Sequence, residues 1–171
     1  MIEEQEYIIE QLHKHNRVNF SCGTDELDRY LQTQASQDIK KNMSVTYVLS
    51  EQGSDVVLGY YSISTIGIFP GDLPSSLIKK LAKYPVLPGV LIGRLAVDEK
   101  YKGRGLGGLL LIDALKRTLA VGEQIGVVAI VVHAKDDKAI NFYKHYGFLA
   151  LPENDFKLFL PLKTIQGLHL D

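Results

Sequence analysis

The residues with the clearest chemical capacity in this chain are four glycines near its middle, Gly103, Gly105, Gly107 and Gly108. They lie between an apolar run at residues 91–97 and a helical apolar run that begins at Leu106. This order predicts a strand, a glycine loop and a helix. Glycine lets another molecule approach the main chain closely, and the first N–H groups of a helix have no partner inside it. The loop is therefore typical of a phosphate site, although a tight turn without a ligand explains the glycines equally well.

Two known phosphate-binding loops can be compared with this one, and the first is excluded by its residues while the second is disfavoured by its place in the chain. A Walker loop ends in Gly-Lys-Ser/Thr, whereas Gly107 is followed here by Gly108 and Leu109. The dinucleotide-binding motif needs Gly-x-Gly-x-x-Gly in a first βαβ unit. Gly103, Gly105 and Gly108 fit this spacing, with a further glycine at 107, but the loop lies past the middle of the chain and not in a first βαβ unit.

The elements that position this loop are expected from apolar periodicity and turn residues. Helices are expected at residues 24–39, 75–83 and 106–122 and from Asp136 or Asp137 to Gly147, and strands at 45–49, 56–66, 91–97, 127–132 and 156–162. The first two strands predict an antiparallel hairpin. The continuously apolar run at 127–132 indicates a strand covered on both faces in a parallel pair. Residues 7–12 fit a strand or a helical turn, and residues 164–171 are expected to be frayed.

Length and composition indicate a single domain over residues 1–171, and 46% hydrophobic residues can bury a full core. The net charge of −1 does not indicate a nucleic-acid binder. No apolar run approaches the roughly 20 residues of a membrane span. The start is acidic, with Glu3, Glu4 and Glu6 and with no basic or apolar leader region, which argues against a signal peptide. The single Cys22 excludes an intrachain disulfide and suits a reducing cytoplasm.

Two further groups of residues are weaker candidates for chemistry. His13 and His15 could suggest a metal, but no Cys or carboxylate is seen to complete a ligand set, so the sequence predicts no metal site. Cys22 could be a nucleophile, but a single small thiol beside Gly23 is more often simply packed.

The glycine loop resembles a motif of one enzyme superfamily. Residues 102–107, Lys-Gly-Arg-Gly-Leu-Gly, are similar to motif A of the GNAT (Gcn5-related N-acetyltransferase) superfamily, Gln/Arg-x-x-Gly-x-Gly/Ala. In that family the motif binds the pyrophosphate of acetyl-coenzyme A (acetyl-CoA) through main-chain amides. Its first position is Lys102 here, a cation without the planar fork of arginine.

The resemblance extends over nearly the whole chain. Residues 139–148 resemble motif B, Ala-x-x-Phe-Tyr-x-x-x-Gly-Phe. Further blocks look like the GNAT toxins of bacterial toxin–antitoxin pairs, at residues 20–31, 59–64, 81–88, 93–98 and 134–139. One departure is His133, where these toxins usually have Asp, and another is the mild acidity of the chain.

The resemblance implies a fold and a set of coenzyme-binding residues. The implied fold class is α/β (α+β), with a mixed central sheet, antiparallel N-terminal strands, a parallel splayed pair at the acetyl-CoA site and helices on both faces. It implies that acetyl-CoA, with no metal, is bound by Leu95, Ala96, Val97, Lys102, Gly103, Arg104, Gly105, Leu106, Gly107, Gly108, Asn141 and Tyr143.

The resemblance also implies roles for a few residues. Main-chain groups of residues 95–97 would polarise the acetyl carbonyl, with the small Ala96 leaving room for the pantetheine arm. By family position, Tyr143 lies next to the coenzyme sulfur and donates a proton to the leaving thiolate. The alternative is that Tyr143 only packs in the core beside Phe142 and Tyr146.

Other roles stay open on the sequence. The general base is Glu99, His133 or a water chain. Arg94 either faces the acceptor groove or pairs with a buried carboxylate. Tyr60 and Tyr61 either border the acceptor site or pack in the sheet.

Three functions are compatible with these observations. The first is a toxin that acetylates the α-amino group of aminoacyl-tRNA, blocks translation in the cytoplasm and is bound by a ribbon-helix-helix antitoxin, with a homodimer expected by analogy. The second is an acetyltransferase for a small amine or a protein N-terminus. The third is a coenzyme-A-binding partner protein without turnover.

Overall fold

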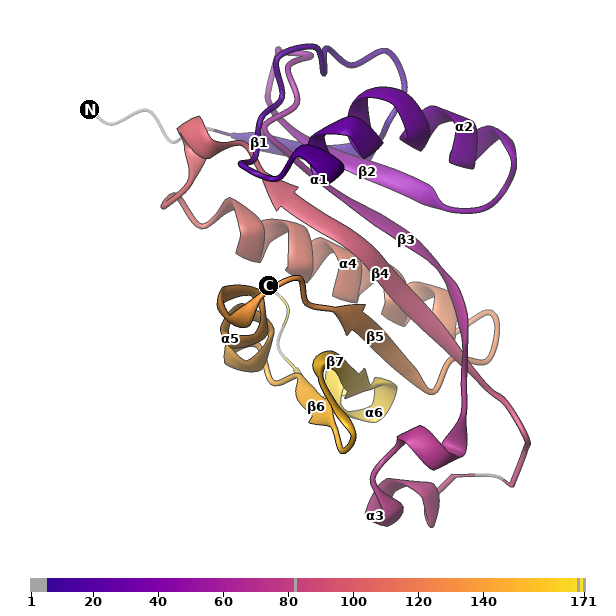
Figure 1. Ribbon diagram of the computed structural model, residues 1–171. Coiled ribbons are helices and arrows are strands. Elements are labelled where there is room, and N and C mark those ends of the chain that lie inside the picture. Colours follow the sequence, from indigo (N-terminus) through magenta and orange to yellow (C-terminus); the bar gives the residue numbers. More distant parts are fainter. Residues whose placement is uncertain (1–5, 82, 169, 171) are drawn as a thin grey trace. The chain divides into compact units, whose positions relative to one another are not determined.

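The computed structural model describes residues 6–81, 83–168 and 170 (Figure 1). The strands are β1 Tyr7–Gln11, β2 Val45–Glu51, β3 Gly59–Ile68, β4 Leu87–Val97, β5 Ala129–His133, β6 Leu149–Leu151 and β7 Asn154–Pro161. The α-helices are α1 Asp25–Arg29, α2 Ala35–Lys40, α3 Ser75–Ile78, α4 Leu106–Gly122, α5 Asp137–His145 and α6 Leu162–Gln166. A π-helix, η1, spans Tyr30–Gln34, and 3₁₀ turns span Pro70–Asp72 (η2) and Glu99–Tyr101 (η3). Glu3 and Glu4, two of the acidic residues that argued against a signal peptide, lie outside the described residues.

Within the described residues, the strands form a seven-stranded mixed sheet in the order β1-β2-β3-β4-β5-β7-β6. β1–β2, β2–β3, β5–β7 and β6–β7 are antiparallel, and β4–β5 is parallel. The parallel ladder runs from Gly89 opposite Ala129 to Ile92 opposite Val132, and β4 continues to Val97. The mixed α/β class and the antiparallel hairpin are therefore confirmed, as is the parallel partner of β4.

The chain divides into two compact units. One holds the described residues up to Ser64 together with Gly93–Ala114, and the other holds Thr65–Ile92 and the chain from Leu115 onward. We call them the first and the second unit. The prediction of a single domain is not tested by this division and stays a prediction.

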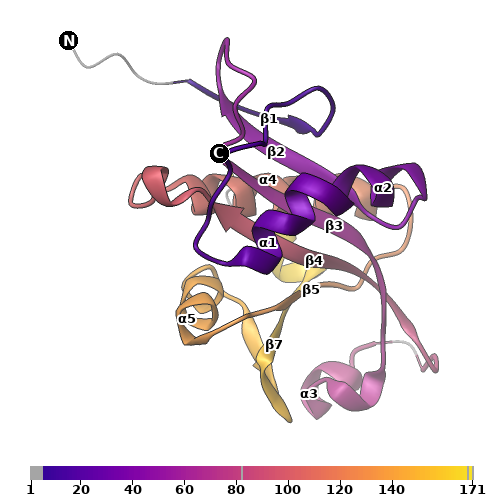
Figure 2. The ribbon, with the colours of Figure 1, turned by 45° about the horizontal axis from the view of Figure 1, so that its top comes forward.

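Neighbouring tyrosines on β3 show how helices cover both faces of the first unit's strands. Because successive side chains of a strand point to opposite faces, Tyr60 and Tyr61 point in opposite directions. The Tyr60 hydroxyl donates to the Leu27 carbonyl at the end of α1, at 2.6 Å, and the Tyr61 hydroxyl donates to Asp113 Oδ2 on α4, also at 2.6 Å. Figure 2 shows α1 and α2 lying along one side of β2 and β3. The apolar cluster under these helices contains Leu12, Phe20, Cys22, Tyr30, Leu31, Ala35, Val48, Val57, Tyr60 and Ala96.

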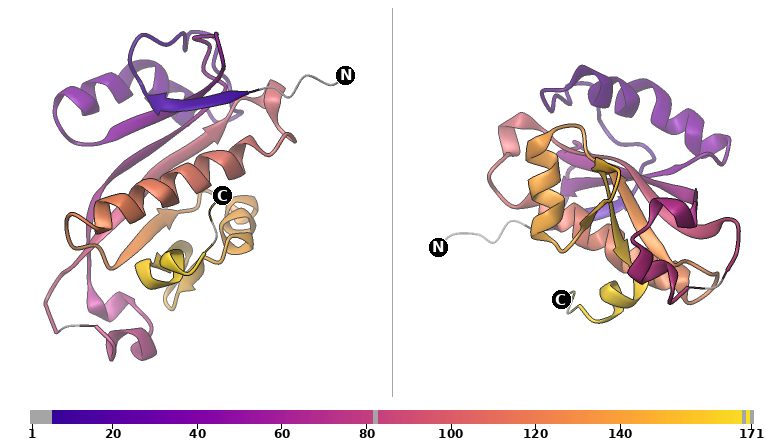
Figure 3. Two further views of the ribbon diagram at one scale, coloured as in Figure 1. Left: turned by 180° about the vertical axis from the view of Figure 1, so that it is seen from behind. Right: turned by 60° about the horizontal axis from the view of Figure 1, so that its bottom comes forward.

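The second unit is built around β5, whose first four residues are all buried, as the apolar run predicted. Its core cluster contains Ile68, Leu73, Leu87, Ala129, Val131, Leu151 and Phe159. Both views in Figure 3 include α5 in orange and α6 in yellow. α5 begins where predicted, because the Asp136 side chain accepts a hydrogen bond from Ala139 N at 2.8 Å.

The structure differs from the sequence expectations in four elements. The helix expected at 24–39 is interrupted by η1, α3 stops at Ile78, and β6 was not expected. Part of the end expected to be frayed, residues 164–166, instead belongs to α6, where the side chain of Ile165 is fully buried. Residues 169 and 171 of that end lie outside the described residues. Residues 7–12, left open between strand and turn, form β1.

The loop that precedes α1 donates hydrogen bonds to the π-helix and to the start of α2. Arg17 Nη1 donates to the Leu31 carbonyl at 2.9 Å and Nη2 to Ser36 Oγ at 2.7 Å. A carbonyl that bonds a side chain in this way is satisfied outside the regular i→i−4 ladder, which lets the helix widen by one residue.

Candidate active site

The glycine loop has the geometry of an open main-chain cradle at a helix N-terminus. Gly103 and Gly105 have φ values of +83° and +77°, which L side chains rarely adopt. A Cβ built on either glycine has no neighbour within 4 Å, so the space beside them is open. The Gly105 carbonyl accepts the N–H of Leu109 at 3.2 Å, which makes Gly105 the N-cap of α4. The N–H groups of the first turn of α4 therefore face the loop, as an anion site requires.

Two cations flank this loop, and both are already engaged. Lys102 Nζ donates to the Cys22 carbonyl at 2.9 Å, and the Arg104 guanidinium lies 5.1 Å from the ring centre of Tyr101. Both side chains belong to exposed residues. Lys102 thus fastens the loop to the segment before α1, and the main-chain amides provide the larger part of any anion contact.

The end of β4 supplies the residues predicted to hold the acetyl group. The Ala96 side chain is only 6% exposed and packs in the cluster with Tyr30 and Tyr60. This packing suits a small side chain, and the expectation that Ala96 leaves room for a pantetheine arm stays a prediction. Leu95 and Val97 are partly buried. Asp98 holds this end in place, because its carboxylate accepts N–H groups from Ser21 at 3.1 Å and Lys100 at 3.0 Å.

Tyr143 lies on α5 with its ring in an apolar setting. It is 6% exposed, and its ring makes edge contacts with Phe142 and Phe148 at centroid distances of 5.2 and 5.5 Å. Among the described residues, none forms a hydrogen bond with its hydroxyl. Burial raises the pKa of Tyr143, so the phenol stays protonated at neutral pH. The group is therefore a proton donor with an unused hydroxyl.

Asn141 lies on the same helix but on another side of it. It is exposed, whereas Tyr143 is buried. Residues two apart on an α-helix do not face each other. Asn141 and Tyr143 would therefore meet different parts of any ligand, and the coenzyme contact predicted for Asn141 stays a prediction.

The two side chains named as candidate bases lie in different units. Glu99 is exposed in the first unit, and its main-chain N–H donates to the Ser21 carbonyl at 2.9 Å. His133 ends β5 in the second unit, opposite Lys157 of β7. His133 is exposed as a residue, but the loss of water around part of its ring, and to a lesser degree the Lys157 cation, lowers its pKa. A neutral imidazole at pH 7 can accept a proton, so His133 has the electrostatics of a base.

Tyr60 and Tyr61 do not line an open site. Both side chains are fully buried, and both hydroxyls are hydrogen-bonded as described above. Of the two interpretations left open by the sequence, packing in the sheet is the one that the structure supports.

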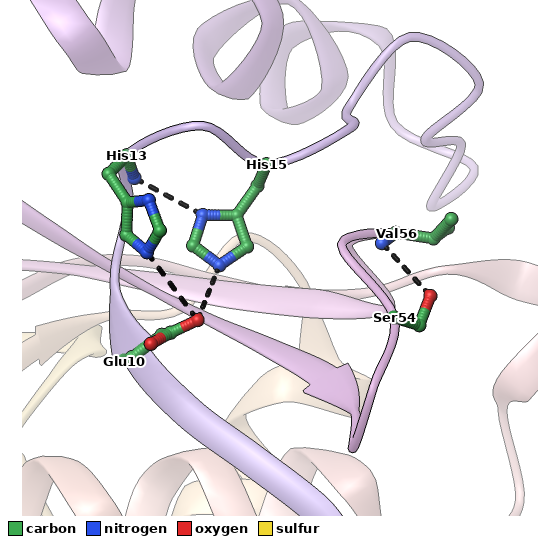
Figure 4. Close-up of polar contacts among 5 residues, drawn as sticks. All are labelled: Glu10, His13, His15, Ser54 and Val56. Atoms are coloured by element: carbon green, nitrogen blue, oxygen red, sulfur yellow. Dashed lines mark hydrogen bonds and ion pairs between the residues drawn. The ribbon is translucent and has the colours of Figure 1, made fainter.

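A group of polar side chains at the end of β1 corrects one sequence inference. Glu10 Oε1 lies 2.9 Å from His15 Nε2 and 3.6 Å from His13 Nε2, so a carboxylate does accompany the two histidines (Figure 4). The sequence analysis did not find this carboxylate, because Glu10 lies in β1 and comes close to the two histidines only where the chain turns back after that strand. His13 N–H donates to His15 Nδ1 at 3.1 Å. His15 Nε2 therefore carries the proton and donates to Glu10, which accounts for the cluster without an ion.

The structure thus groups the predicted residues by unit. In the first unit the glycine loop, the end of β4 and Arg94 belong to one compact body. In the second unit Tyr143, Asn141 and His133 belong to one compact body.

Among the helices in the described part of the chain, none is both long and apolar enough to cross a membrane.

Comparison with known proteins gives this arrangement a family. The model of the acetyltransferase (GNAT) domain matches residues 44–149. The probable toxin TacT of Sinorhizobium fredii is 31% identical over 170 residues, with 94% of each chain covered. The tRNA-acetylating toxin of Mycobacterium tuberculosis is 36% identical over 151 residues, covering 88% of this chain and 89% of the relative.

Solved structures agree with these matches. A tyrosine-to-phenylalanine variant of KacT superposes with a TM-score of 0.91 at 29% identity, covering 96% of this chain and all of that one. AtaT complexed with acetyl-methionyl-tRNAfMet gives a TM-score of 0.87 at 31% identity, covering 94% of this chain and 98% of that one.

The chain belongs to the GNAT acetyltransferase family, and the expected GNAT fold is confirmed. It is an N-acetyltransferase, and one of its relatives is a tRNA-acetylating toxin.

Proposed function

We propose that this N-acetyltransferase transfers the acetyl group of acetyl-CoA to the α-amino group of aminoacyl-tRNA, and that it is the toxin of a toxin–antitoxin pair. The observation that carries the proposal is the similarity, over 94% of the chain and at 31% identity, to AtaT complexed with acetyl-methionyl-tRNAfMet. The similarity to the tRNA-acetylating toxin of Mycobacterium tuberculosis supports the same substrate class. A substrate of this kind is met in the cytoplasm.

Acetyl-CoA is the proposed acetyl donor. A crystal structure of AtaTR is bound with acetyl-CoA, and AtaTR is 31% identical to this chain. The glycine loop fits the pyrophosphate of the coenzyme, because Gly103 and Gly105 leave open space beside the N-terminus of α4. The main-chain groups of residues 95–97 are proposed to bind the pantetheine arm and to polarise the acetyl carbonyl.

The reaction requires two proton transfers. The neutral α-amine attacks the thioester carbonyl, a C–N bond forms, and the C–S bond breaks to release a thiolate. We assign protonation of the thiolate to Tyr143, whose hydroxyl has no internal partner and whose pKa is raised by burial. The thiol that forms has a pKa of about 8.5 and is more acidic than the phenol, so the tyrosine acts through a hydrogen bond to sulfur that strengthens as negative charge develops there. The proton lost by the attacking amine goes to the base, for which Glu99, His133 and a water chain are the candidates.

The proposed partner is an antitoxin. A tyrosine-to-phenylalanine variant of AtaT was solved with the C-terminus of the antitoxin AtaR, at a TM-score of 0.80 to this chain. By analogy we expect a ribbon-helix-helix antitoxin whose tail wraps this protein, and a homodimer of the toxin.

Cell-free translation tests the proposal. Adding the protein with acetyl-CoA should stop synthesis of a reporter, and adding it with coenzyme A, which has no acetyl group to give, should leave synthesis unchanged. Arrest in both reactions would point to a binding effect, and arrest in neither would refute the toxin assignment.

A further inference from the structure

Arg94 is a partly buried cation of β4 for which the sequence left two roles open. Its guanidinium Cζ lies 3.5 Å from the ring centre of Tyr30, so it stacks on that ring. Among the described residues, none accepts a hydrogen bond from Arg94 or forms an ion pair with it. The sequence alternative of pairing with a buried carboxylate is therefore not what the structure has.

Arg17, in the same unit, differs from Arg94 in its hydrogen bonding. Its guanidinium also contacts the α1–η1–α2 segment, but it donates hydrogen bonds to the Leu31 carbonyl and to Ser36 Oγ. An arginine that serves the fold is satisfied in this way, because an unpaired charged group that loses water costs free energy. Arg94 has the same five donors and none of them is used inside the described protein.

The ring beneath Arg94 is held rigidly. Tyr30 is 6% exposed, and its hydroxyl is bound by Asp38 Oδ2 at 2.8 Å and by Ser44 Oγ at 2.9 Å. Tyr30 is also the first residue of η1, and π-helical turns are frequent at functional sites. The Asp38 carboxylate accepts hydrogen bonds from Gln34 and Tyr30 and none from Arg94. Those hydrogen bonds, and to a lesser degree the Arg94 charge, lower the pKa of Asp38. One face of the guanidinium is thus covered by a fixed ring while its N–H edge keeps its donors.

We infer that Arg94 binds a phosphate group at the 3′ end of the RNA acceptor, with Tyr30 holding the guanidinium in place. This rests on the proposed function, which supplies the RNA. The planar fork of arginine matches two oxygens of a phosphate in a bidentate contact, and stacking on an aromatic ring leaves that fork available.

The position of Arg94 along β4 suits this role. It lies two residues before Ala96, so both side chains are on the same face of the strand, about 7 Å apart along its axis. The acetyl group is proposed to lie at residues 95–97. An anchor at Arg94 would therefore hold a phosphate roughly one nucleotide from the reacting amine, which aligns the amine for attack. Arg94 is a positioning residue in this account.

Binding measurements with charged and uncharged tRNA test the inference. The affinity of the wild type, Arg94→Gln and Arg94→Lys for bulk tRNA is measured at several salt concentrations, and acetylation of the aminoacylated form is followed in parallel. Arg29→Gln is the matched control, because it removes one positive charge from an exposed position of α1 in the same unit. Affinity for acetyl-CoA, measured by calorimetry, checks that each variant is folded.

The expected result is a loss of about tenfold or more in RNA affinity for Arg94→Gln, with unchanged affinity for acetyl-CoA. The slope of log affinity against log salt should become shallower by about 0.7, the value for one phosphate on a single strand. Arg94→Lys should keep the slope and lose part of the affinity, since it keeps the charge but not the fork. Arg29→Gln should leave the affinity within about twofold of the wild type.

Each other outcome is decisive. If Arg94→Gln binds tRNA with wild-type affinity, the phosphate contact is wrong. If it binds more weakly but with an unchanged salt slope, the phosphate contact is also wrong, and Arg94 would instead contact an uncharged group such as the ester carbonyl. Arg94-dependent binding without any acetylation by the wild type would refute the proposed function and keep the phosphate contact. A wild type that does not bind tRNA overturns both.

Discussion

At the scale of single residues, the proposed chemistry depends on Tyr143 and His133, two side chains of the second unit whose pKa values are shifted in opposite directions. Burial raises the pKa of Tyr143, which keeps the phenol protonated, and lowers the pKa of His133, which keeps the imidazole neutral. A protonated donor and a neutral acceptor are the pair that acetyl transfer to an amine needs at pH 7. Neither shift could be read from the sequence, because both depend on which neighbours exclude water.

The pH dependence of turnover tests the role of His133. Because its pKa is lowered from 6.5, the ring is neutral above that pH and gains a proton only on further acidification. If His133 is the base, kcat stays constant from pH 7 upward and falls as the pH drops through the lowered pKa. His133→Gln should remove this inflection and reduce kcat by about 100-fold.

Glu99→Gln is the comparison variant for that profile. If His133 is the base, Glu99 takes no part in the proton transfer and an unchanged profile is expected from this variant. If Glu99→Gln removes the inflection and His133→Gln does not, the base is Glu99. If both variants keep it, the proton leaves through water.

At the scale of elements, the junction between β4 and α4 carries the proposed coenzyme site. The two positive φ values of the loop require glycine, while the cations beside it fasten the loop to its surroundings. The loop is thus specified by main-chain conformation more than by side-chain charge. This explains why Lys102 can stand where the family motif usually has Gln or Arg.

Gly105→Ala tests the loop. The new Cβ meets open space, so the change acts through the φ of +77° and not through a clash. A left-handed alanine costs about 1–2 kcal/mol, which we expect to appear as a rise of roughly fivefold or more in the KM for acetyl-CoA. Gly105→Asn should be milder, because Asn tolerates this conformation better.

Gly53→Ala is the matched control for that strain. Gly53 has a φ of +81° and equally open surroundings, but it lies between β2 and β3, outside the coenzyme site. It should lower the melting temperature by an amount similar to Gly105→Ala and leave the KM unchanged. Equal KM values for all the variants would mean that the loop does not bind the coenzyme.

Much of the fold could be predicted because its elements carry strong local signals. The apolar run of β5, the Asp136 cap and the helix after Leu106 fixed three elements near their observed limits. β6 spans only Leu149–Leu151, too short for any periodic pattern, and α6 is stabilised by burial of Ile165, a tertiary effect. The π-helix could not be predicted, because it depends on hydrogen bonds from Arg17, which is 14 residues from Leu31 in the sequence.

The candidate site could be predicted only in its main-chain part. Glycine spacing indicated the loop, but no local signal says whether Arg94 meets a carboxylate or the ring of Tyr30. The same limit applied to Glu10, whose contact with His15 depends on the path of the chain after β1. The orientation of a long polar side chain depends on the residues packed around it, and the sequence alone does not say which residues those are.

At the scale of the whole molecule, the central proposal is that this GNAT protein acetylates aminoacyl-tRNA. The family is established by a domain match over residues 44–149 and by relatives covered over most of their length. The substrate is the proposed part. A fold alone does not decide a substrate, so product chemistry has to decide it.

Mass spectrometry of the product tests this claim most directly. Bulk aminoacyl-tRNA is incubated with acetyl-CoA and the wild type, Tyr143→Phe or Tyr146→Phe, and the released amino acids are analysed. Tyr146, partly buried near the end of α5, is the control for loss of a phenol hydroxyl. We predict N-acetylated amino acids with the wild type and Tyr146→Phe, and a yield lower by about 100-fold or more with Tyr143→Phe. Acetylated product at the wild-type rate from Tyr143→Phe would remove Tyr143 from the mechanism, and no N-acetylated amino acid from the wild type would contradict the claim itself.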